Sequence, residues 1–214
     1  MPSSFSNPAG AAVARGLVEV IQKNKEYLSE IDGAIGDGDH GINMNKGFTM
    51  FMERTNLAEV DLAGALKALG RVLLMEIGGS MGPIYGTFFR EMAKIITGKE
   101  QIDAALFAQM LRAALTGVQG LGEAKLGDKT MLDTLIPATE AFAQELAGGG
   151  DFPACLDAME KAAKAGWEGT KDMEAKVGRA SRLGKRSIGV VDAGATSCQL
   201  LLQAFAENIR PLLG

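Results

Sequence analysis

Apolar residues recur at helical spacing along most of the chain, and glycine-rich or polar stretches interrupt them at intervals. In the segment 61–77, leucines stand at positions 62, 66, 69 and 73, which places them on one face of an α-helix. Aromatic residues make up only 6% of the 214 residues. Because strands favour aromatic and β-branched residues, this balance predicts an all-α protein.

Eight amphipathic helices are expected, in one domain over residues 1–214, because no linker-like composition divides the chain. Their approximate ranges are 8–31, 42–54, 61–77, 84–96, 103–119, 131–147, 153–175 and 195–210. Asn7 and Pro8 fit the N-cap and first residue of the first helix. No stretch is a convincing strand, and 187–191 is the best candidate.

The short connections favour antiparallel neighbours in an up-and-down bundle, where alternate loops come to the same end. By this count the loops around residues 32–41, 78–83, 120–130 and 176–194 share one end of the molecule. These are the loops richest in glycine and charge, so we expect a site there.

Composition excludes several partners. The formal charge of −4 and the pI of about 5.2 disfavour nucleic acid, which binds basic surfaces. No apolar run is long enough for a membrane span, and the first residues lack the pattern of a secretory signal. Cys155 and Cys198 stand alone, without CxxC spacing. We therefore expect a cytoplasmic protein with reduced thiols, no membrane association and no nucleic-acid partner.

The stretch IDGAIGDGDHGINMN (31–45) holds Asp32, Asp37 and Asp39 within eight residues, followed by the only histidine, His40. Carboxylates this close raise one another's pKa unless a cation neutralises them. A solvated acidic turn remains an alternative. An EF-hand does not fit, because position 12 of a loop starting at Asp37 is Phe48 rather than Glu. Mg²⁺ completed by water and substrate phosphates fits better.

Two neighbouring features each allow two interpretations. His40 either makes an ordinary hydrogen bond or lies near a phosphate, because it begins a helix whose free N–H groups favour anions. The glycines at 78–82 either end a helix or let backbone N–H groups approach phosphate oxygens.

Two stretches, 122–130 and 178–187, resemble P-loops but have the wrong spacing and follow no strand. We reject both as P-loops. Their basic side chains are still suited to a polyphosphate, unless 176–194 is only a basic surface segment; they are Lys129, Arg179, Arg182, Lys185 and Arg186. Carboxylates, glycines and basic residues at one end together indicate a Mg-nucleotide site.

Four sequence blocks carry more specific information than the spacing of single residues. AIGDGDHGINMNKGF (34–48), GGSMGPIYGTFF (78–89), GDKTMLDTLIPA (127–138) and GRASRLGKRSIGVVDAGATS (178–197) closely resemble the nucleotide-binding (L) subunit of dihydroxyacetone kinases. The resemblance covers essentially the whole chain, in order. It implies an all-α barrel of eight antiparallel amphipathic helices, with the nucleotide in the loops at one end.

By position, the resemblance assigns Asp32, Asp37 and Asp39 to two Mg²⁺ ions that bridge the phosphates of ADP or ATP. The positions matching the family's nucleotide contacts are His40, Gly41, Ile42, Asn43, Ser80, Met81, Gly122, Thr130, Met131, Arg179, Asp192, Ala193 and Gly194. Ala193 departs from the Asp-Pro-Gly expected in the family, which implies a less rigid turn.

The resemblance also implies a phosphotransferase that is active only with a partner. The family transfers a phosphoryl group to a terminal hydroxyl of dihydroxyacetone, which a separate K subunit holds covalently on a histidine. No catalytic side chain is assigned to this chain, because the Mg-nucleotide delivers the phosphoryl group. In one branch bound ADP is rephosphorylated by a phosphohistidine protein (M subunit) of the phosphotransferase system, and the Asp-His-Gly at 39–41 favours that branch.

Several alternatives are compatible with the sequence. One is an ATP-dependent dihydroxyacetone or erythrulose kinase subunit. Another is a non-catalytic helical module that binds lipid or regulates a second protein, although such a module has no need of three clustered carboxylates. A homodimer is also compatible with the sequence.

Overall fold

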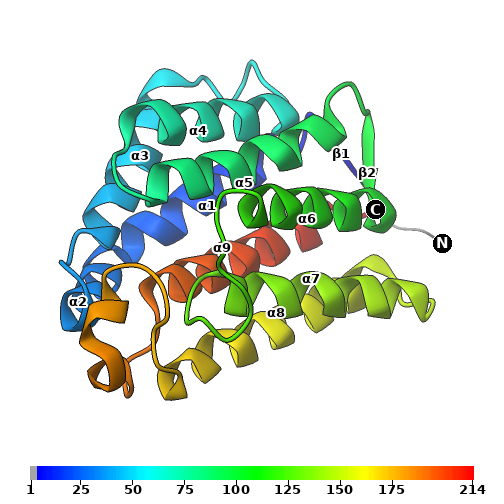
Figure 1. The fold of residues 1–214 in the computed structure, drawn as a ribbon. Coiled ribbons are helices and arrows are strands. Elements are labelled where there is room, and N and C mark those ends of the chain that lie inside the picture. Colours follow the sequence, from blue (N-terminus) through cyan, green and yellow to red (C-terminus); the bar gives the residue numbers. More distant parts are fainter. Residues whose placement is uncertain (1–3) are drawn as a thin grey trace.

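The computed structural model describes residues 4–214, and these residues are predominantly helical (Figure 1). The described helices are α1 (Ala11–Lys23), α2 (Lys25–Ile35), α3 (His40–Arg54), α4 (Leu62–Glu76), α5 (Met81–Ile96), α6 (Ala104–Gln119), α7 (Leu132–Ala147), α8 (Phe152–Gly169) and α9 (Ala193–Ile209). Short 3₁₀ helices follow at η1 (Thr170–Asp172), η2 (Ala180–Ser187) and η3 (Arg210–Leu212). The predicted all-α class is confirmed.

The expected number of eight helices is wrong for the described part of the chain, which has nine α-helices because the first predicted helix is two. The break falls at Asn24, whose φ and ψ are −103° and 11°. Its side chain donates to the Val20 carbonyl at 2.8 Å. Asparagine competes in this way with the backbone hydrogen bonds of a helix, which accounts for the interruption between α1 and α2.

A small sheet is also present, which the sequence did not predict. Strand β1 (Ser4–Ser6) pairs antiparallel with β2 (Gln101–Asp103). Each strand has only three residues, too few for an alternating pattern to be read from the sequence. The predicted strand candidate at 187–191 is not a strand, because it begins at the last residue of η2 and continues as a turn.

Asn7 does not cap the helix that follows it, because α1 begins only at Ala11. Asn7 is fully buried and bridges two other segments instead. Its Oδ1 accepts from the Ala63 N–H at 3.2 Å, in the first turn of α4. Its Nδ2 donates to the carbonyls of Ile96 and Lys99, at 3.1 and 2.8 Å. Asn7 therefore satisfies a free N–H in the first turn of α4, whose N-cap is Asp61, and holds the end of α5 beside it.

Aromatic side chains fill the interior of the barrel in two groups. One group lies between α3 and α5, with ring centroids 5.0–6.4 Å apart, and consists of Phe48, Tyr85, Phe88 and Phe89. The other joins α6, α7, α8 and α9 at 5.4–6.0 Å and consists of Phe107, Phe142, Phe152 and Phe205. All are at most 2% exposed. The described interior at these two places is a packed core.

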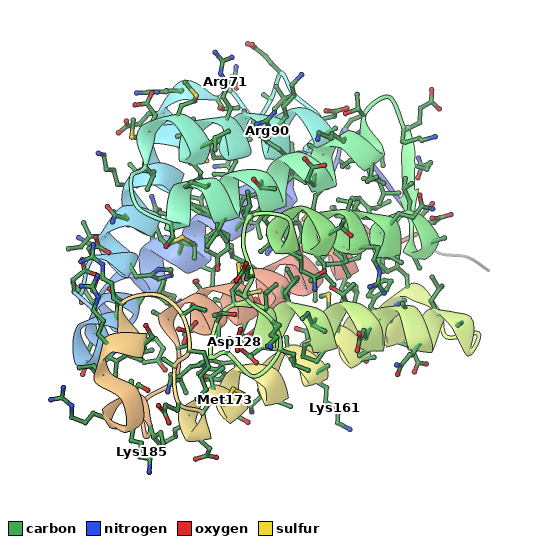
Figure 2. The ribbon with its side chains drawn as sticks, in the orientation of Figure 1. Arg71, Arg90, Asp128, Lys161, Met173 and Lys185 are labelled. Carbon is green, nitrogen blue, oxygen red and sulfur yellow. The ribbon has the colours of Figure 1, made fainter. Side chains whose placement is uncertain are left out.

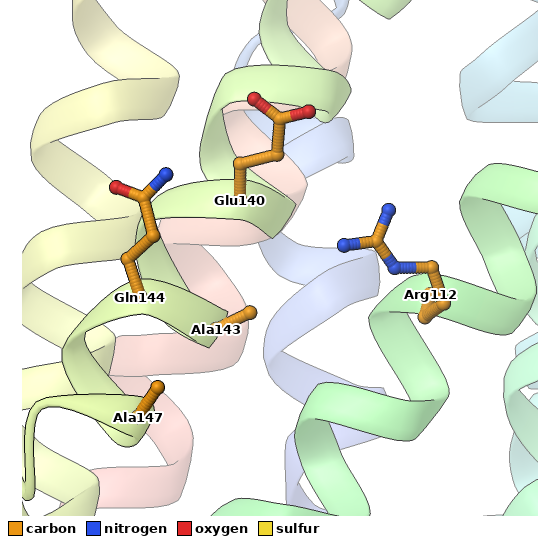
Figure 3. A pocket seen from close by; sticks show the side chains of 5 residues that line it. All are labelled: Arg112, Glu140, Ala143, Gln144 and Ala147. Atoms are coloured by element: carbon orange, nitrogen blue, oxygen red, sulfur yellow. The ribbon is translucent and has the colours of Figure 1, made fainter.

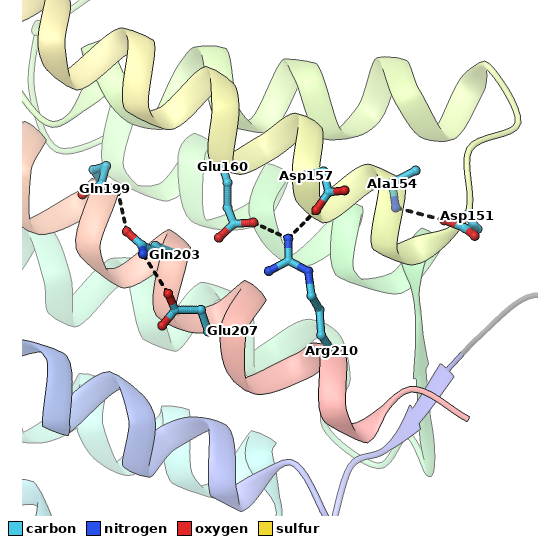
Figure 4. A network of polar contacts seen from close by, with 8 residues as sticks. All are labelled: Asp151, Ala154, Asp157, Glu160, Gln199, Gln203, Glu207 and Arg210. Carbon is cyan, nitrogen blue, oxygen red and sulfur yellow. Dashed lines mark hydrogen bonds and ion pairs between the residues drawn. The ribbon is translucent and has the colours of Figure 1, made fainter.

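The C-terminus lies at one end of the barrel, beside the small sheet (Figure 1), where the Gly214 nitrogen is 3.5 Å from the Ser4 carbonyl oxygen. At that end Arg210 joins α9 to α8 through Asp157, at 2.5 Å, and through Glu160 (Figure 4). None of the helices described in residues 4–214 is long and apolar enough to cross a membrane.

We predict that Asn7→Ala lowers the free energy of unfolding by about 3 kcal/mol, because it leaves several buried backbone groups without partners. Denaturant unfolding measures the change. Asn56→Ala is the matched control, because the Asn56 side chain is exposed and bonds only near its own turn. An Asn7 variant as stable as the Asn56 variant would contradict the bridging role.

Candidate functional site

Four connections gather at the end of the barrel opposite the small sheet and the C-terminus (Figure 1). They are the α2–α3 loop, the α4–α5 loop, the α6–α7 loop and the long segment between α8 and α9 that contains η2. These are the four loops that the helix count predicted at one end. The N-termini of α3, α5, α7 and α9 meet there, so free N–H groups and positive helix dipole ends converge on one region.

The three aspartates are brought together as predicted. Asp32 lies in the last turn of α2, and Asp37 and Asp39 follow in the loop. One carboxylate oxygen from each lies within 4.8 Å of the others. Gly38 has φ of +77°, a conformation that few other residues adopt, and it turns the chain between the two loop aspartates. Three converging carboxylates are the ligand type that a hard cation such as Mg²⁺ prefers.

The charges of this cluster are only partly compensated. Burial and the neighbouring carboxylates of Asp37 and Asp32 raise the pKa of Asp39, while Arg179 and the Asn43 side chain lower it. The Arg179 guanidinium lies 2.7 Å from Asp37 Oδ2. The segment between α8 and α9 thus supplies a positive group to the site. A cation is already favoured at this position, which supports the fit of a metal ion.

His40 begins α3 beside the aspartates. Its backbone N–H donates to Asp32 Oδ2 at 3.2 Å, and its ring Nε2 lies 2.9 Å from Ser197 Oγ. Burial lowers its pKa to about 4, although Asp32 opposes the shift. The ring is therefore neutral at pH 7. A Cβ on Gly41 would meet the Lys25 carbonyl at 2.0 Å, so only glycine lets α3 start this close to α2.

The sequence interpretation missed the side-chain partner of His40, Ser197, and the tyrosine that contacts Ser197 in turn. Ser197 in α9 and Tyr85 in α5 are buried, and their hydroxyl oxygens lie 2.6 Å apart. Both stand inside blocks that the sequence analysis singled out, at 178–197 and 78–89. A serine 157 residues from His40 gives no local signal of contact.

The α4–α5 loop presents an open backbone. Gly79 has φ of +70°, and no atom lies within 4 Å of a Cβ built on Gly78 or Gly79. Ser80 is exposed at the N-cap of α5, and its side chain makes no capping bond. Met81 is buried at the first position of the helix. The loop is therefore free for a ligand to approach its N–H groups.

The side chain of Asp133 holds the α6–α7 loop by hydrogen bonds to its backbone. Asp133 is 1% exposed and accepts from the N–H groups of Gly127 and Thr130, at 2.5 and 2.8 Å. Met131 meets α9, because its nitrogen lies 3.5 Å from a Cβ built on Gly194. Gly122 is exposed with open space around it, so no contact brings it to the other site residues.

Lys129 has a different role from the one that its sequence context suggested. It is 2% exposed, and its ammonium donates to the carbonyls of Met173, Ser187 and Val190, at 3.1, 2.5 and 2.6 Å. Its backbone φ is +62°, unusual for a residue with a Cβ. All three donors are used, so Lys129 holds the α8–α9 segment and does not bind phosphate.

The other predicted basic residues of that segment differ in position. Arg179, Arg182, Lys185 and Arg186 are all exposed, and Arg179 also contacts Asp37. Lys185 lies on the outer side of the segment and extends into solvent (Figure 2). Within the described residues 4–214, Arg179 is the one of these four that forms an ion pair with an aspartate of the cluster.

The turn 192–194 starts α9. Asp192 Oδ2 accepts from the Ala195 N–H at 2.7 Å as the N-cap. Burial raises the pKa of Asp192 to about 7, which the Ala195 N–H and Lys129 partly offset. Ala193 takes the first helical position, where proline is well tolerated. Ala193 stands where proline was expected, and α9 still begins at this residue.

A second concave region lies elsewhere. Figure 3 shows a shallow hollow between α6 and α7, and its lining residues are Arg112, Glu140, Ala143, Gln144 and Ala147. It is on the side of the barrel, without clustered carboxylates or convergent helix N-termini. The chemistry of the molecule is concentrated at the loop end instead.

Residues 34–207 match the family model described as the DAK2 domain. The chain belongs to the DAK2 domain family. The match contains every site residue that the sequence analysis assigned except Asp32, whose place in the cluster rests on the geometry. The expectation of a phosphotransferase is confirmed at the level of the family, because the relatives are kinases or kinase subunits.

Similar proteins include the ADP-binding subunit of the PEP-dependent dihydroxyacetone kinase of Escherichia coli (strain K12), 38% identical, covering 88% of this chain and 90% of the relative. The ADP-binding subunit of PEP-dependent dihydroxyacetone kinase 1 of Listeria innocua is 39% identical over 89% and 90%. The crystal structure of the dihydroxyacetone kinase of C. freundii with AMP-PNP and Mg²⁺ matches at a TM-score of 0.69 and 25% identity, covering 97% of this chain and 34% of that one. This DAK2 chain thus spans about a third of the structural relative.

We predict that Lys129→Met loosens the α8–α9 segment, because it leaves three carbonyls without their shared donor. Amide hydrogen exchange over residues 174–190 should accelerate by about tenfold or more. Lys125→Met, four residues earlier at an exposed position, is the control. Unchanged exchange in the Lys129 variant would show that the ammonium does not order the segment.

Proposed function

We propose that this DAK2 chain binds a Mg-nucleotide, ADP or ATP, at the loop end and is the nucleotide-binding subunit of a dihydroxyacetone kinase. The observation that carries the proposal is the convergence of the carboxylates of Asp32, Asp37 and Asp39 beside four helix N-termini. Relatives are named ADP-binding subunits, and a structural neighbour was solved with AMP-PNP and Mg²⁺, which supports it.

In this proposal Asp32, Asp37 and Asp39 hold two Mg²⁺ ions. The nucleotide contacts are those assigned from the sequence: His40, Gly41, Ile42, Asn43, Ser80, Met81, Gly122, Thr130, Met131, Arg179, Asp192, Ala193 and Gly194. Backbone N–H groups at the starts of α3, α5 and α9 face the phosphates, and the open glycines of the α4–α5 loop let them approach.

The chemistry is phosphoryl transfer, in which bound Mg²⁺ neutralises charge on the phosphate oxygens. Arg179 adds a guanidinium beside Asp37, on a segment that Lys129 holds in place. His40 is engaged with Ser197 through one ring nitrogen and is not free to act as a base from that atom. In this proposal the acceptor hydroxyl is activated by a partner, the K subunit that holds dihydroxyacetone.

For the phosphoryl donor we propose that bound ADP is rephosphorylated by a phosphohistidine protein, the M subunit. Identity favours this branch: 38% to the PEP-dependent subunit of E. coli and 37% to the PTS-dependent subunit of Lactococcus lactis, against 32% to a D-erythrulose kinase of Mycolicibacterium smegmatis. The ATP-dependent dihydroxyacetone or erythrulose kinase is the competing function. A cytoplasmic location and a homodimer stay predictions.

A non-catalytic lipid-binding module is disfavoured by the packing of the core. The aromatic rings of α6, α7, α8 and α9 lie in mutual contact where an acyl chain would have to enter. A purely regulatory module would also have no use for carboxylates that repel one another.

We predict that Asp39→Asn has opposite effects on binding and stability. Calorimetric titration should show Mg-ADP affinity falling by at least about 100-fold, because a metal ligand is lost. In metal-free buffer the same change should raise the melting temperature by about 2 °C, because it removes one of three repelling charges. Glu30→Gln, an exposed acidic residue on α2, is the charge-matched control. Normal Mg-ADP affinity in Asp39→Asn would refute the metal site.

We predict that the purified, desalted protein retains ADP, in keeping with a resident nucleotide that is rephosphorylated in place. Native mass spectrometry followed by release and identification of the nucleotide tests this. An empty protein that readily takes up Mg-ATP would instead identify a conventional ATP-dependent kinase subunit.

A further inference from the structure

The end of α8 and the start of α9 are joined by side chains as well as by the chain between them. The indole N–H of Trp167 donates to Thr196 Oγ1 at 2.8 Å, and the Thr196 hydroxyl donates to the Asp192 carbonyl at 2.7 Å. The Asp192 N–H in turn donates to Thr170 Oγ1 at 3.0 Å, and the Thr170 hydroxyl donates to the Trp167 carbonyl at 2.6 Å. The four residues thus close a ring of hydrogen bonds, called the four-residue ring below.

The direction of each bond in the four-residue ring is fixed by the chemistry of its groups. An indole or backbone N–H can only donate, and a carbonyl oxygen can only accept. Each threonine hydroxyl therefore accepts one hydrogen from an N–H and gives its own hydrogen to a carbonyl. Thr170 and Thr196 are 0% and 1% exposed, so water does not compete for these hydroxyl groups and each bond stays within the protein.

The chain between the two helices is poorly suited to fix the start of α9. Residues 171–191 run as 3₁₀ helix and irregular backbone, and their turns at Gly178, Gly184 and Gly189 have positive φ. The four-residue ring spans this segment directly, because its bonds between the two helix ends join residues 22 and 29 positions apart. It therefore sets the start of α9 relative to α8 without passing through the segment.

The end of α8 is itself held against a neighbouring helix. A Cβ on Gly166 would lie 2.1 Å from the Asp133 carbonyl oxygen of α7. Only glycine allows so close an approach, and it stands directly before Trp167. The ring is therefore built on a part of α8 whose distance from α7 is fixed by packing.

The first turn of α9 leaves two N–H groups for a ligand. Asp192 accepts from the Ala195 N–H through its carboxylate and from the Thr196 N–H through its carbonyl. Within residues 4–214 no acceptor bonds the N–H groups of Ala193 and Gly194. These are two of the positions that the resemblance assigned to the nucleotide. An N–H at a helix start suits a phosphate oxygen, and its contribution depends on being held in the right place.

We propose that Thr170 and Thr196 are positioning residues: the four-residue ring holds the first turn of α9 so that its two free N–H groups donate to the nucleotide phosphates. Both hydroxyl groups act through the backbone of Asp192, one through its N–H and the other through its carbonyl. The effect on the nucleotide rests on the proposed function, whereas the ring itself does not.

The ring is tested first in nucleotide-free, metal-free protein. Trp167 is the only tryptophan, so ¹⁵N-labelled protein gives one indole N–H signal. Thr196→Val removes the acceptor of this N–H, and it should shift the signal and accelerate exchange of its hydrogen, whereas Thr196→Ser should keep both close to wild type. Thr170→Val should accelerate exchange of the Asp192 amide hydrogen by about tenfold or more. Unchanged exchange of both hydrogens in the valine variants would overturn the proposal.

The matched control is Thr139→Val on α7. The Thr139 hydroxyl is buried and makes no hydrogen bond within the described residues. The control therefore makes the same change at a buried threonine outside the ring, and it should leave both exchange rates unchanged. Equal acceleration in Thr139→Val and in the ring variants would indicate a general loss of stability and would overturn the proposal.

Calorimetric titration with Mg-ADP tests the positioning role. Thr170→Val and Thr196→Val should each weaken the affinity by about tenfold, the order expected when a hydrogen bond to a charged oxygen is lost. Because either change opens the same ring, the double variant should lose much less than the roughly hundredfold that independent effects would give. Thr196→Ser and Thr139→Val should bind as the wild type does.

The outcomes separate the ring from the nucleotide. Wild-type affinity in a variant whose ring is open would overturn the positioning role, and so would losses in the double variant that simply multiply. An equal loss of affinity in Thr196→Ser would assign the effect to packing and not to the hydroxyl group, which also overturns it. Failure of the wild type to bind Mg-ADP would refute the proposed function, while the nucleotide-free exchange rates would still decide whether the ring holds the start of α9.

Discussion

Mutual repulsion of three carboxylates is the constraint around which this end of the barrel is built. Asp32, Asp37 and Asp39 converge within 4.8 Å, an arrangement that opposes folding unless positive charge is placed nearby. The fold provides that charge in two forms. Four helices direct their N-termini to this end, and Arg179 contributes a guanidinium to Asp37 at 2.7 Å. Together they compensate the negative charge of the cluster only in part, because the pKa of Asp39 stays raised.

The parts of the fold that were predictable from the sequence have local causes. Helical periodicity is visible within one segment, and three aspartates within eight residues are bound to lie near one another. The grouping of the four loops at one end followed from short connections alone. The extra helix boundary at Asn24 and the three-residue strands escaped notice because one side chain, or three residues, give too little pattern.

The errors have a common physical origin in long-range contacts. Asn7 precedes a proline and looks like a cap for its own helix, yet its partners are in α4 and at the end of α5. Lys129 looks like a phosphate ligand beside a glycine and an aspartate, yet its ammonium is buried against three carbonyls up to 61 residues away. A sequence shows that a polar residue needs partners, but only the tertiary structure shows which ones it finds.

Lys129 and Arg179 together link the order of the α8–α9 segment to the charge of the aspartate cluster. Lys129 fixes carbonyls on both sides of η2, at Met173 and at Val190. Arg179 stands between these two points in the chain, so its contact with Asp37 requires little further loss of backbone freedom. A salt bridge between exposed side chains is weak by itself. Placed on a segment that is already held, the same guanidinium becomes a defined part of the site, which gives a role to a buried lysine whose ammonium donates to three backbone carbonyls.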